Sequence, residues 1–502
     1  MRATISVCAQ SAWMWGRRLW RMTAGGGAVS PAVALLGIAD VLAPLSTRFV
    51  EAGYELALVG GPVRDVLMGR DGGWITNDLD LTTDARPEVI ESLLTGWADH
   101  VWDVGMRFGT VGARKGEHHL EITTYRSESY DPSSRKPEVS FGHSLAGDLA
   151  RRDFTVNAMA VRLPSLEFVD LHDGMRDLGE AVLRPPGTPE DSFADDPLRM
   201  MRAARFVSQL GFSIAPEVLE AMTAMASRLE IVSAERIRDE LSKLLLGAHP
   251  RRGLEVVVLT GMAPYVLPEL PALQLEIDEH HRHKDVYEHS LTVMEQAIDL
   301  EKDHAPASEP DLVLRLAALL HDIGKPKTRR FETDGGVSFH HHEVVGARMV
   351  RKRLTALRFP NEIVDEVSKL TELHLRFHGY GTGEWTDSAV RRYVRDSGDQ
   401  LVRLHKLTRA DCTTRNRKRA AALSAAYDGL EARIDSLAQQ EELASIRPDL
   451  DGNAIMEILG IGPGREVGQA YAFLMDLRLD RGPLDYDEAK QELLDWWVKR
   501  QA

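Results

Sequence analysis

Two aspartates, Asp78 and Asp80, are separated by one apolar residue in the run DLDLTT. Successive side chains of a β-strand point to opposite faces, so both carboxylates would share one face and Leu79 and Leu81 the other. Two like charges this close are unfavourable unless a cation offsets them, and Mg²⁺ prefers carboxylate and phosphate oxygens. The spacing predicts a magnesium site for phosphoryl transfer, although a lone Asp-x-Asp also occurs at exposed strand ends.

A glycine pair, Gly60 and Gly61, precedes these aspartates in the run LVGGPVRD. Two residues without side chains between a strand and a helix let backbone N–H groups meet a phosphate, but Gly-Gly-Pro is also an ordinary turn. Arg64 behind the pair is interpreted as a phosphate contact or as a brace for the helix. Glu121, in the alternating run HLEITTYR, is the candidate third acid, or else a solvent-facing strand residue.

A second set of chemically capable residues lies in the later half of the chain. His289 and the pair His321 and Asp322 fall on apolar helical patterns, and Asp411 follows in LTRADCTTRN. Imidazole nitrogens and carboxylate oxygens together bind borderline divalent metals, and facing helices bring such ligands together. A lone histidine on such a face is more often a core residue, but this combination predicts a metal centre.

The elements that must position these residues change character along the chain. From about residue 54 to 163, short β-rich runs alternate with helical patterns, which indicates a mixed α/β head. From about residue 190 onward, apolar residues recur at three- and four-residue spacing, which is typical of helices. Turn-rich segments at 172–193 and 267–275 mark connectors.

Composition limits the class of protein, its partners and its location. The 502 residues are 43% hydrophobic and 27% charged, as in a soluble globular protein with several domains. The net charge of −15 argues against coating nucleic acid nonspecifically, but arginine clusters at 150–154, 198–206 and 414–421 allow a localised basic track. Two cysteines predict no disulfide framework and a cytoplasmic location. No apolar run approaches the roughly 20 residues that span a bilayer, so no membrane partner is expected.

Five motifs in order resemble those of class II tRNA nucleotidyltransferases, which are the CCA-adding enzymes and their poly(A) polymerase relatives. These motifs cover residues 54–260 and read GGPVRD, DLDLTT, RRDFTVNAMA, DDPLRMMRAARF and ERIRDEL. The resemblance implies that Asp78 and Asp80 bind two Mg²⁺ ions. It also implies triphosphate contacts from Gly60, Gly61 and Arg64, and places Arg152, Asp153 and Asn157 near the incoming ribose and phosphates.

The DDPLR motif implies base selection by Asp196 and Arg199. Residues three apart on a helix are neighbours, so a carboxylate acceptor and a guanidinium donor can face one base edge. Cytosine and adenine offer an exocyclic amine where uracil and guanine offer an oxygen, so this edge selects C and A without a template. Asp195 replaces the family's usual glutamate and receives no base contact. Arg202 and Arg205 continue the face and are expected to bind nucleotide, whereas a surface salt bridge is the alternative. ERIRDEL is interpreted as structural, tying neck helices together.

Two features favour CCA addition over poly(A) synthesis. The run GMRFGTVGAR resembles the CCA-adding branch, and the polar segment 125–142 resembles the flexible loop that enzymes adding only two cytidines lack. The expected reaction is therefore template-independent addition of CCA to the 3′ end of tRNA from CTP and ATP, with release of pyrophosphate. The alternatives are a poly(A) polymerase, or a phosphohydrolase whose head senses nucleotides.

Residues 280–420 resemble the HD superfamily of metal-dependent phosphohydrolases, which are found attached to some CCA-adding enzymes. The resemblance implies a divalent ion (Mn, Ni, Co or Mg) on His289, His321, Asp322 and Asp411, with further contacts from His342, His374 and His378. Hydrolysis of phosphomonoesters or 2′,3′-cyclic phosphates is expected, with Lys325 near the phosphate, and a scaffold for tRNA binding or packing is the alternative. The sequence leaves the oligomeric state open.

The expected fold class is α+β, with a nucleotidyltransferase head of mixed sheet and helices followed by an all-α neck and body and an all-α HD domain. We expect a disordered N-terminal extension, with Met22 a candidate start, and a helical tail of unassigned role. The predicted boundaries are 1–33 for the extension, 34–170 for the head, 171–270 for the neck and body, 271–425 for the HD domain and 426–502 for the tail.

Overall fold

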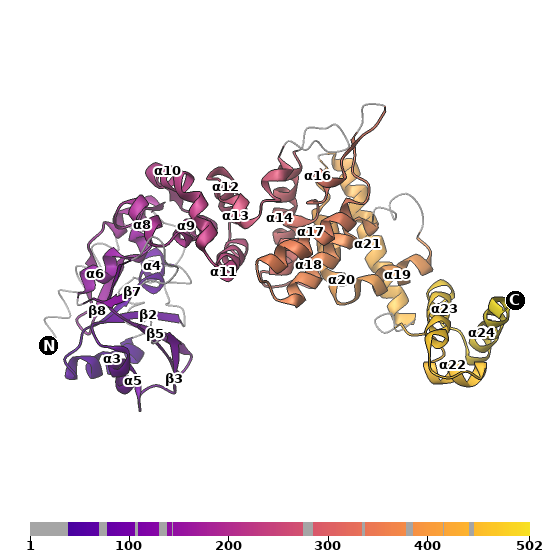
Figure 1. Cartoon of the computed structure of the whole chain (residues 1–502), viewed down its shortest axis with the longest axis horizontal. Coiled ribbons are helices and arrows are strands. Elements are labelled where there is room, and N and C mark those ends of the chain that lie inside the picture. The colour runs from indigo at the N-terminus through magenta and orange to yellow at the C-terminus, as the bar shows by residue number, and fades with distance from the viewer. Residues whose placement is uncertain are drawn as a thin grey trace. The chain divides into compact units, whose positions relative to one another are not determined.

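The structure is a computed structural model, and the chain divides into two compact units between Tyr265 and Val266 (Figure 1). Within the part that the structure describes, no helix is long and apolar enough to cross a membrane. The described residues are 39–69, 78–105, 109–129, 138–142, 144–274, 285–333, 337–377, 385–414, 416–440 and 446–501.

A seven-stranded mixed sheet forms the centre of the first unit (Figure 1). Its strand order is β3-β4-β5-β2-β1-β8-β9; β2 and β5 run parallel, and the other neighbouring strands run antiparallel. The strands are β1 (Leu56–Val59), β2 (Asp78–Thr83), β3 (His100–Gly105), β4 (Thr110–Lys115), β5 (His118–Thr124), β8 (Met159–Leu163) and β9 (Glu167–Asp170).

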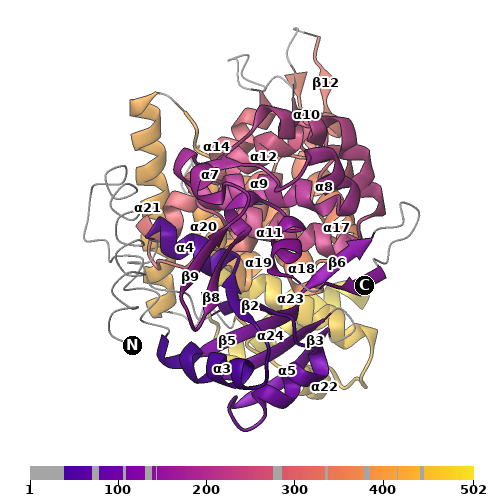
Figure 2. The same ribbon diagram turned by 90° about the vertical axis from the view of Figure 1, so that its left-hand side faces the viewer.

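Helices cover both faces of this sheet. In Figures 1 and 2, α3 (Ala39–Glu51) and α5 (Pro87–Leu94) lie on one side, and α4 (Gly61–Met68) lies on the other. On the face that carries alternate residues of β1, buried Leu145 and Leu149 of α6 (Leu145–Ala150) pack with strand side chains. The head core therefore lies on both sides of β1 and β2, which fixes these two strands firmly.

The neck is a set of short helices that continues the first unit. Helix α9 packs against α11 and α12, and Gly253 lets α9 and α12 approach closely, because a Cβ atom there would lie 2.7 Å from the carbonyl oxygen of Ala204. The helices are α7 (Gly174–Glu180), α8 (Pro189–Asp195), α9 (Leu198–Leu210), α10 (Pro216–Met225), α11 (Ala234–Leu245), α12 (Pro250–Leu259) and α13 (Ala263–Val266), with short parallel strands β10 (Val182–Leu183) and β11 (Ser213–Ile214).

The second unit is helical apart from one short hairpin, β12 (Arg330–Phe331) and β13 (Val337–Ser338), within the residues described. The HD region consists of α14 (Val286–Asp303), α15 (Leu312–Leu320), α16 (Lys325–Thr328), α17 (His342–Ala356), α18 (Asn361–Leu373), α19 (Asp387–Ser397) and α20 (Leu401–Ala410). Helices α17 and α18 pack side by side (Figure 1), and α14 packs against α15.

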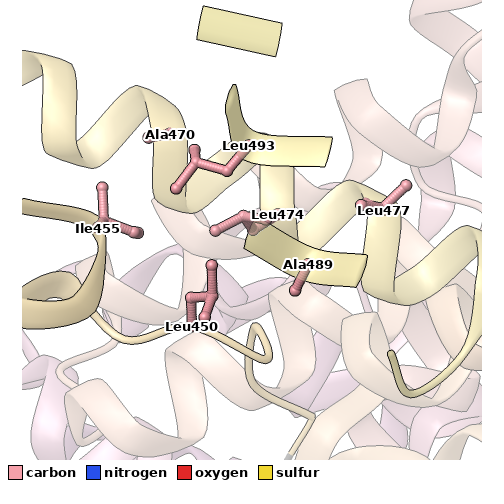
Figure 3. Packing of buried hydrophobic residues seen from close by; sticks show 7 residues of the cluster. All are labelled: Leu450, Ile455, Ala470, Leu474, Leu477, Ala489 and Leu493. Carbon is pink, nitrogen blue, oxygen red and sulfur yellow. The ribbon is translucent and has the colours of Figure 1, made fainter. Parts of the chain in front are cut away.

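The C-terminal helices have a small core of their own. Helix α21 (Arg417–Gln440) is followed by α22 (Gly452–Leu459), α23 (Arg465–Arg481) and α24 (Tyr486–Gln501). Arg392 of α19 pairs with Asp476 and Asp480 of α23 and so links this core to the HD region. Figure 3 shows the buried side chains that fill it, which are Leu450, Ile455, Ala470, Leu474, Leu477, Ala489 and Leu493.

The structure confirms the α+β fold class, with a mixed-sheet head followed by helices. One local expectation was wrong: the end of the turn-rich segment 172–193 belongs to helix α8. Thr188 caps the first turn of this helix, and Pro189 lies at the first helical position, where no backbone N–H donor is needed. The segment 125–142 begins and ends in a hairpin of β6 (Arg126–Ser129) and β7 (Glu138–Phe141), and its residues 130–137 lie outside the described part, as does the extension 1–33.

Candidate active site

Three carboxylates gather on one face of the head sheet. Asp78 and Asp80 point away from the core, whereas Leu79 and Leu81 between and beyond them are buried, as period-two alternation predicts. Glu121 of β5 pairs in register with Asp80 across the parallel ladder, so the two side chains project to the same face. The structure therefore brings the predicted third acid beside the aspartate pair.

The electrostatics of this face favour a cation. Desolvation by the surrounding protein raises the pKa of Asp80, although this residue is exposed, and Asp78 adds to the rise, while Arg152 lowers it. Desolvation likewise raises the pKa of Glu121, which is also exposed, and the charges of Asp80 and Asp78 raise it further. Like charges held together in this way fit a hard divalent ion such as Mg²⁺, which takes carboxylate oxygens and neutralises their repulsion.

Gly60 touches this site directly. Its φ of +74° disfavours an L side chain, and a Cβ atom would lie 3.2 Å from Oδ2 of Asp80 and 3.1 Å from Nη1 of Arg152. Gly60 also precedes α4, whose first residue is Gly61. The absence of a side chain at residue 60 therefore lets the backbone lie close to the carboxylate of Asp80 and to the guanidinium of Arg152.

Arg152 is held by a residue that sequence reasoning missed. Asp148 is fully buried and accepts hydrogen bonds from Arg152 (Nη2–Oδ2, 3.3 Å), from Arg151 (Nη2–Oδ1, 2.7 Å) and from Thr82 (Oγ1–Oδ2, 3.2 Å). Burial alone would raise the pKa of Asp148, but Arg152 and Arg151 lower it below its ordinary value. The available signal was an aspartate four residues before Arg152, one helical turn away.

A buried network lies behind the site and contains several predicted nucleotide contacts. Asp153 accepts from Arg202 (Nε–Oδ2, 2.8 Å) and from Asn157 (Nδ2–Oδ1, 3.1 Å), and Arg64 donates to Oδ1 of Asn157 (2.7 Å). Burial would raise the pKa of Asp153, yet Arg202 and Asn157 hold it well below its ordinary value. Because Arg64 also pairs with Asp65 and is itself buried, its geometry favours the bracing interpretation.

Asp196 and Arg199 lie at the junction of two helices, not together on one helix as expected. Asp196 follows α8, and α9 begins only at Leu198, because the intervening Pro197 interrupts the helical hydrogen bonds. Oδ1 of Asp196 accepts from the backbone N–H of Leu198 (3.1 Å). Buried Arg199 donates to Oγ of Ser192 (2.9 Å) and to the carbonyl oxygen of Arg151.

The structure confirms that the ERIRDEL motif, which lies in α11, joins neck helices through ion pairs. Glu240 of α11 forms a buried ion pair with Arg205 of α9 (3.0 Å), and Arg236 pairs with Asp196. Arg205 also lies over the ring of Phe206. Arg205 was predicted to bind nucleotide, and the structure places its guanidinium in this internal pair.

The second candidate site is a cluster of six metal-ligating side chains in the HD region. It joins the predicted residues His289, His321, Asp322 and Asp411 with His342 and His374. Nε2 of His289 lies 2.9 Å from Oδ1 of Asp411, and Nε2 of His321 lies 3.2 Å from Oδ2 of Asp322. Lys325 donates to the same Oδ2 (2.8 Å), whereas His378 lies outside the described residues.

Three of these histidines are oriented alike. Nδ1 of His321, His342 and His374 each faces the carbonyl oxygen three residues earlier, at 2.9, 2.8 and 2.7 Å. If Nδ1 carries the proton, each Nε2 is left free to accept a metal. A hydrogen bond of this kind orients the imidazole of metal-ligating histidines, so the arrangement suits a metal centre.

Burial and charge in the cluster also fit a divalent ion. Burial would lower the pKa of His321, but Asp322 and Asp411 raise it to about 9. Burial and the neighbouring His321 together lower the pKa of His374 to about 3. Oδ1 of Asp322 lies 3.2 Å from Nε2 of His342, and both residues are buried. Buried imidazole nitrogens and carboxylate oxygens this close together match a mixed nitrogen and oxygen metal site.

Comparison with known proteins gives a consistent assignment. Residues 56–184 match the poly A polymerase head domain, residues 211–273 match the probable RNA and SrmB-binding site of polymerase A, and residues 286–416 match the HD domain. The fold is thus that of a nucleotidyltransferase head followed by an HD domain.

Curated relatives narrow the assignment. An A-adding tRNA nucleotidyltransferase of Deinococcus radiodurans is 33% identical over 84% of this chain and 91% of its own. The chain therefore belongs to the tRNA nucleotidyltransferase and poly(A) polymerase family. CCA-adding enzymes of Levilactobacillus brevis and Bacillus subtilis are each 41% identical, over 45% and 44% of this chain and 55% and 53% of their own. The chain thus spans about half the length of these CCA-adding relatives.

Solved structures show the same fold. The Bacillus stearothermophilus CCA-adding enzyme in complex with CTP matches with a TM-score of 0.64 at 24% identity, covering 94% of this chain and 99% of that one. The Thermotoga maritima CCA-adding enzyme complexed with tRNA matches with a TM-score of 0.55 at 19% identity, covering 92% and 96%.

Proposed function

We propose that this protein adds CCA to the 3′ end of tRNA, using CTP and ATP and releasing pyrophosphate. The observation that carries the proposal is the face on which Asp78, Asp80 and Glu121 meet beside Gly60 and Arg152. Such a face suits nucleotidyl transfer, in which positioning and charge neutralisation supply most of the catalysis. The names of the relatives support tRNA as the acceptor.

In this proposal each residue of the face has a distinct role. Asp78 and Asp80 hold Mg²⁺, and Glu121 adds negative charge next to Asp80. Bound Mg²⁺ supplies charge neutralisation for the triphosphate and favours ionisation of the attacking 3′-hydroxyl. The backbone at Gly60 and Gly61 admits the triphosphate, and Arg152, which Asp148 orients, donates to its oxygens.

Base selection is assigned to Asp196 and Arg199 at the α8–α9 junction. The carboxylate of Asp196 accepts from the exocyclic amine of cytosine or adenine, and Arg199 donates to the ring nitrogen or carbonyl oxygen. Arg199 also donates to Ser192, so base contact requires its remaining N–H groups or an exchange of partners. The reaction is placed in the cytoplasm, where a chain with two cysteines stays reduced.

A second candidate is addition of the terminal adenosine alone. It is favoured by one finding: a relative that aligns with 84% of this chain is an A-adding enzyme. Purified protein should be incubated with tRNA ending before CCA, and with tRNA ending in CC, together with CTP, ATP or both. CCA addition predicts C incorporation on the first substrate, A-adding activity predicts extension of the second alone, and long A tracts without C would show poly(A) synthesis.

The catalytic assignment is tested by Asp80→Asn. This variant keeps the size of the side chain but removes a metal-binding charge, so incorporation on every tRNA substrate should fall by a factor of at least about 100. Asp99→Asn, on an exposed residue away from the carboxylate face, is the matched control. Equal incorporation by both variants would refute the role of Asp80.

For the HD region we propose a divalent-metal phosphohydrolase that acts on phosphomonoesters or 2′,3′-cyclic phosphates. The buried pair of Asp322 and His342 supports metal binding, and Lys325, which pairs with Asp322, is proposed to contact a phosphate oxygen. Metal content of the purified protein should fall in His321→Ala, together with hydrolysis of a 2′,3′-cyclic nucleotide. Loss of tRNA affinity without any change in hydrolysis would instead support a scaffold.

A further inference from the structure

The junction between α8 and α9 is held by arginines from different parts of the first unit. On the head side, Arg199 of α9 donates to the carbonyl oxygen of Arg151. On the neck side, Arg228 donates to the carbonyl oxygen of Ala194, the residue before the end of α8 (3.0 Å). The junction that carries Asp196 is thus fixed to both head and neck.

Arg236 makes the contact that bears directly on base selection. Its Nη2 lies 2.7 Å from Oδ2 of Asp196, while Oδ1 of Asp196 accepts from the backbone N–H of Leu198. Both oxygens of the carboxylate therefore have a donor, and the plane of the carboxylate is set. The Asp196 side chain is 20% exposed and that of Arg236 is 53% exposed, so a nucleobase can reach the pair.

The position of Arg236 is itself well determined. It lies in the first turn of α11, one helical turn before Glu240, whose buried ion pair with Arg205 fixes α11 against α9. Ser233 caps the helix by accepting from the backbone N–H of Arg236. The capped helix and the buried anchor thus place the backbone of Arg236 where its guanidinium reaches Asp196.

We propose that Arg236 is a positioning residue for nucleobase selection, a role that rests on the proposed function of Asp196. The terminal torsion of an aspartate is broad, so an unheld carboxylate samples many orientations. Arg236 restricts Asp196 to one orientation, in which the carboxylate accepts from an exocyclic amine. Without Arg236, the carboxylate discriminates less between bases that offer an amine and bases that offer an oxygen.

The test compares Arg236→Gln and Arg236→Lys with Arg238→Gln. Arg238 lies on the same helix and pairs with its neighbour Asp239, so Arg238→Gln removes an arginine of α11 without touching Asp196. Equilibrium binding of Mg-CTP, Mg-UTP and Mg-tripolyphosphate is measured without tRNA, together with the melting temperature of each variant. Tripolyphosphate reports the phosphate subsite and carries no base.

We expect Arg236→Gln to weaken CTP binding about tenfold, as loss of one charge-assisted hydrogen bond implies, while UTP and tripolyphosphate binding change little. Arg236→Lys should restore part of the CTP preference, and Arg238→Gln should retain all of it. An unchanged CTP-to-UTP ratio in Arg236→Gln, or an equal loss in Arg238→Gln, would overturn the proposal.

The same measurements separate this inference from the proposed function. If the unsubstituted protein prefers CTP over UTP but extends no tRNA, the proposed reaction fails while the role of Arg236 is still decided by the binding ratios. If the unsubstituted protein binds CTP and UTP equally, Asp196 does not select bases, and the role of Arg236 falls with it.

Discussion

Substitution of Gly60 by alanine tests whether the backbone beside the carboxylates is part of the site. The residue has φ +74° and ψ −138°, a region that glycine alone occupies readily. The new methyl group would also lie 3.2 Å from Oδ2 of Asp80 and 3.1 Å from Nη1 of Arg152, which is closer than ordinary van der Waals contact. The substitution therefore combines backbone strain with crowding of the Asp80 carboxylate and the Arg152 guanidinium.

The other end of the same helix supplies a matched control. Gly69 has φ +64° and ψ 26°, and a Cβ atom there would meet nothing within 4 Å. Gly69→Ala should therefore cost about 1–2 kcal/mol of unfolding free energy from backbone strain alone. Gly60→Ala should cost a similar amount, about 1–3 kcal/mol, because its strain has the same origin.

The two variants should differ in activity far more than in stability. Unfolding free energies come from urea titration, and kcat/KM comes from nucleotide incorporation into tRNA lacking CCA. We expect Gly60→Ala to lose at least about tenfold in kcat/KM, because displacing Asp80 or Arg152 by a few tenths of an ångström weakens transition-state contacts. Gly69→Ala should stay within about twofold of the unsubstituted protein. Equal activity in the two variants would refute the argument that Gly60 borders the reacting groups.

Three further predictions concern charge. Asp148→Asn should lower the unfolding free energy in urea by about 2 kcal/mol, because it leaves Arg151 and Arg152 without their carboxylate; a loss below about 0.5 kcal/mol would contradict this. The folded-state pKa of Asp148 lies below the ordinary value of 3.8, so the stability that this carboxylate contributes is complete above pH 3.8 and is lost as the pH falls below 3.8. Asp148→Asn should therefore reduce the dependence of the unfolding free energy on pH in that acidic range. The pKa values of Asp80 and Glu121 are raised, so ionisation of these carboxyl groups opposes folding as the pH rises. Bound Mg²⁺ offsets their charge and should raise the melting temperature of the protein at pH 7, and this rise should be smaller in Asp80→Asn.

The HD cluster includes two histidines whose part in metal binding the sequence left open. His342 and His374 were named only as further contacts, yet each is buried and has its Nδ1 atom next to a backbone carbonyl oxygen. With Asp322 they form a second group of three ligand atoms beside the group of His289, His321 and Asp411. The cluster is thus larger than the four residues predicted to bind the metal.

Local pattern determined much of the head. Alternation of polar and apolar residues over DLDLTT was enough to place Asp78 and Asp80 on one face, because the period of a strand depends on backbone geometry alone. Three- and four-residue spacing likewise predicted the helical body, and the order of the motifs predicted the family. These properties belong to short segments, so the sequence shows them directly.

Tertiary structure alone decided which of these segments meet. Strand register placed Glu121 beside Asp80, and no local pattern specifies which strand pairs with which. In the packed structure Arg205 pairs with Glu240, and Arg152 donates to the buried Asp148. A buried charge requires a partner, and that partner can come from any part of the chain. The sequence by itself therefore determined the chemistry that each segment offers, whereas long-range packing decided which groups act together.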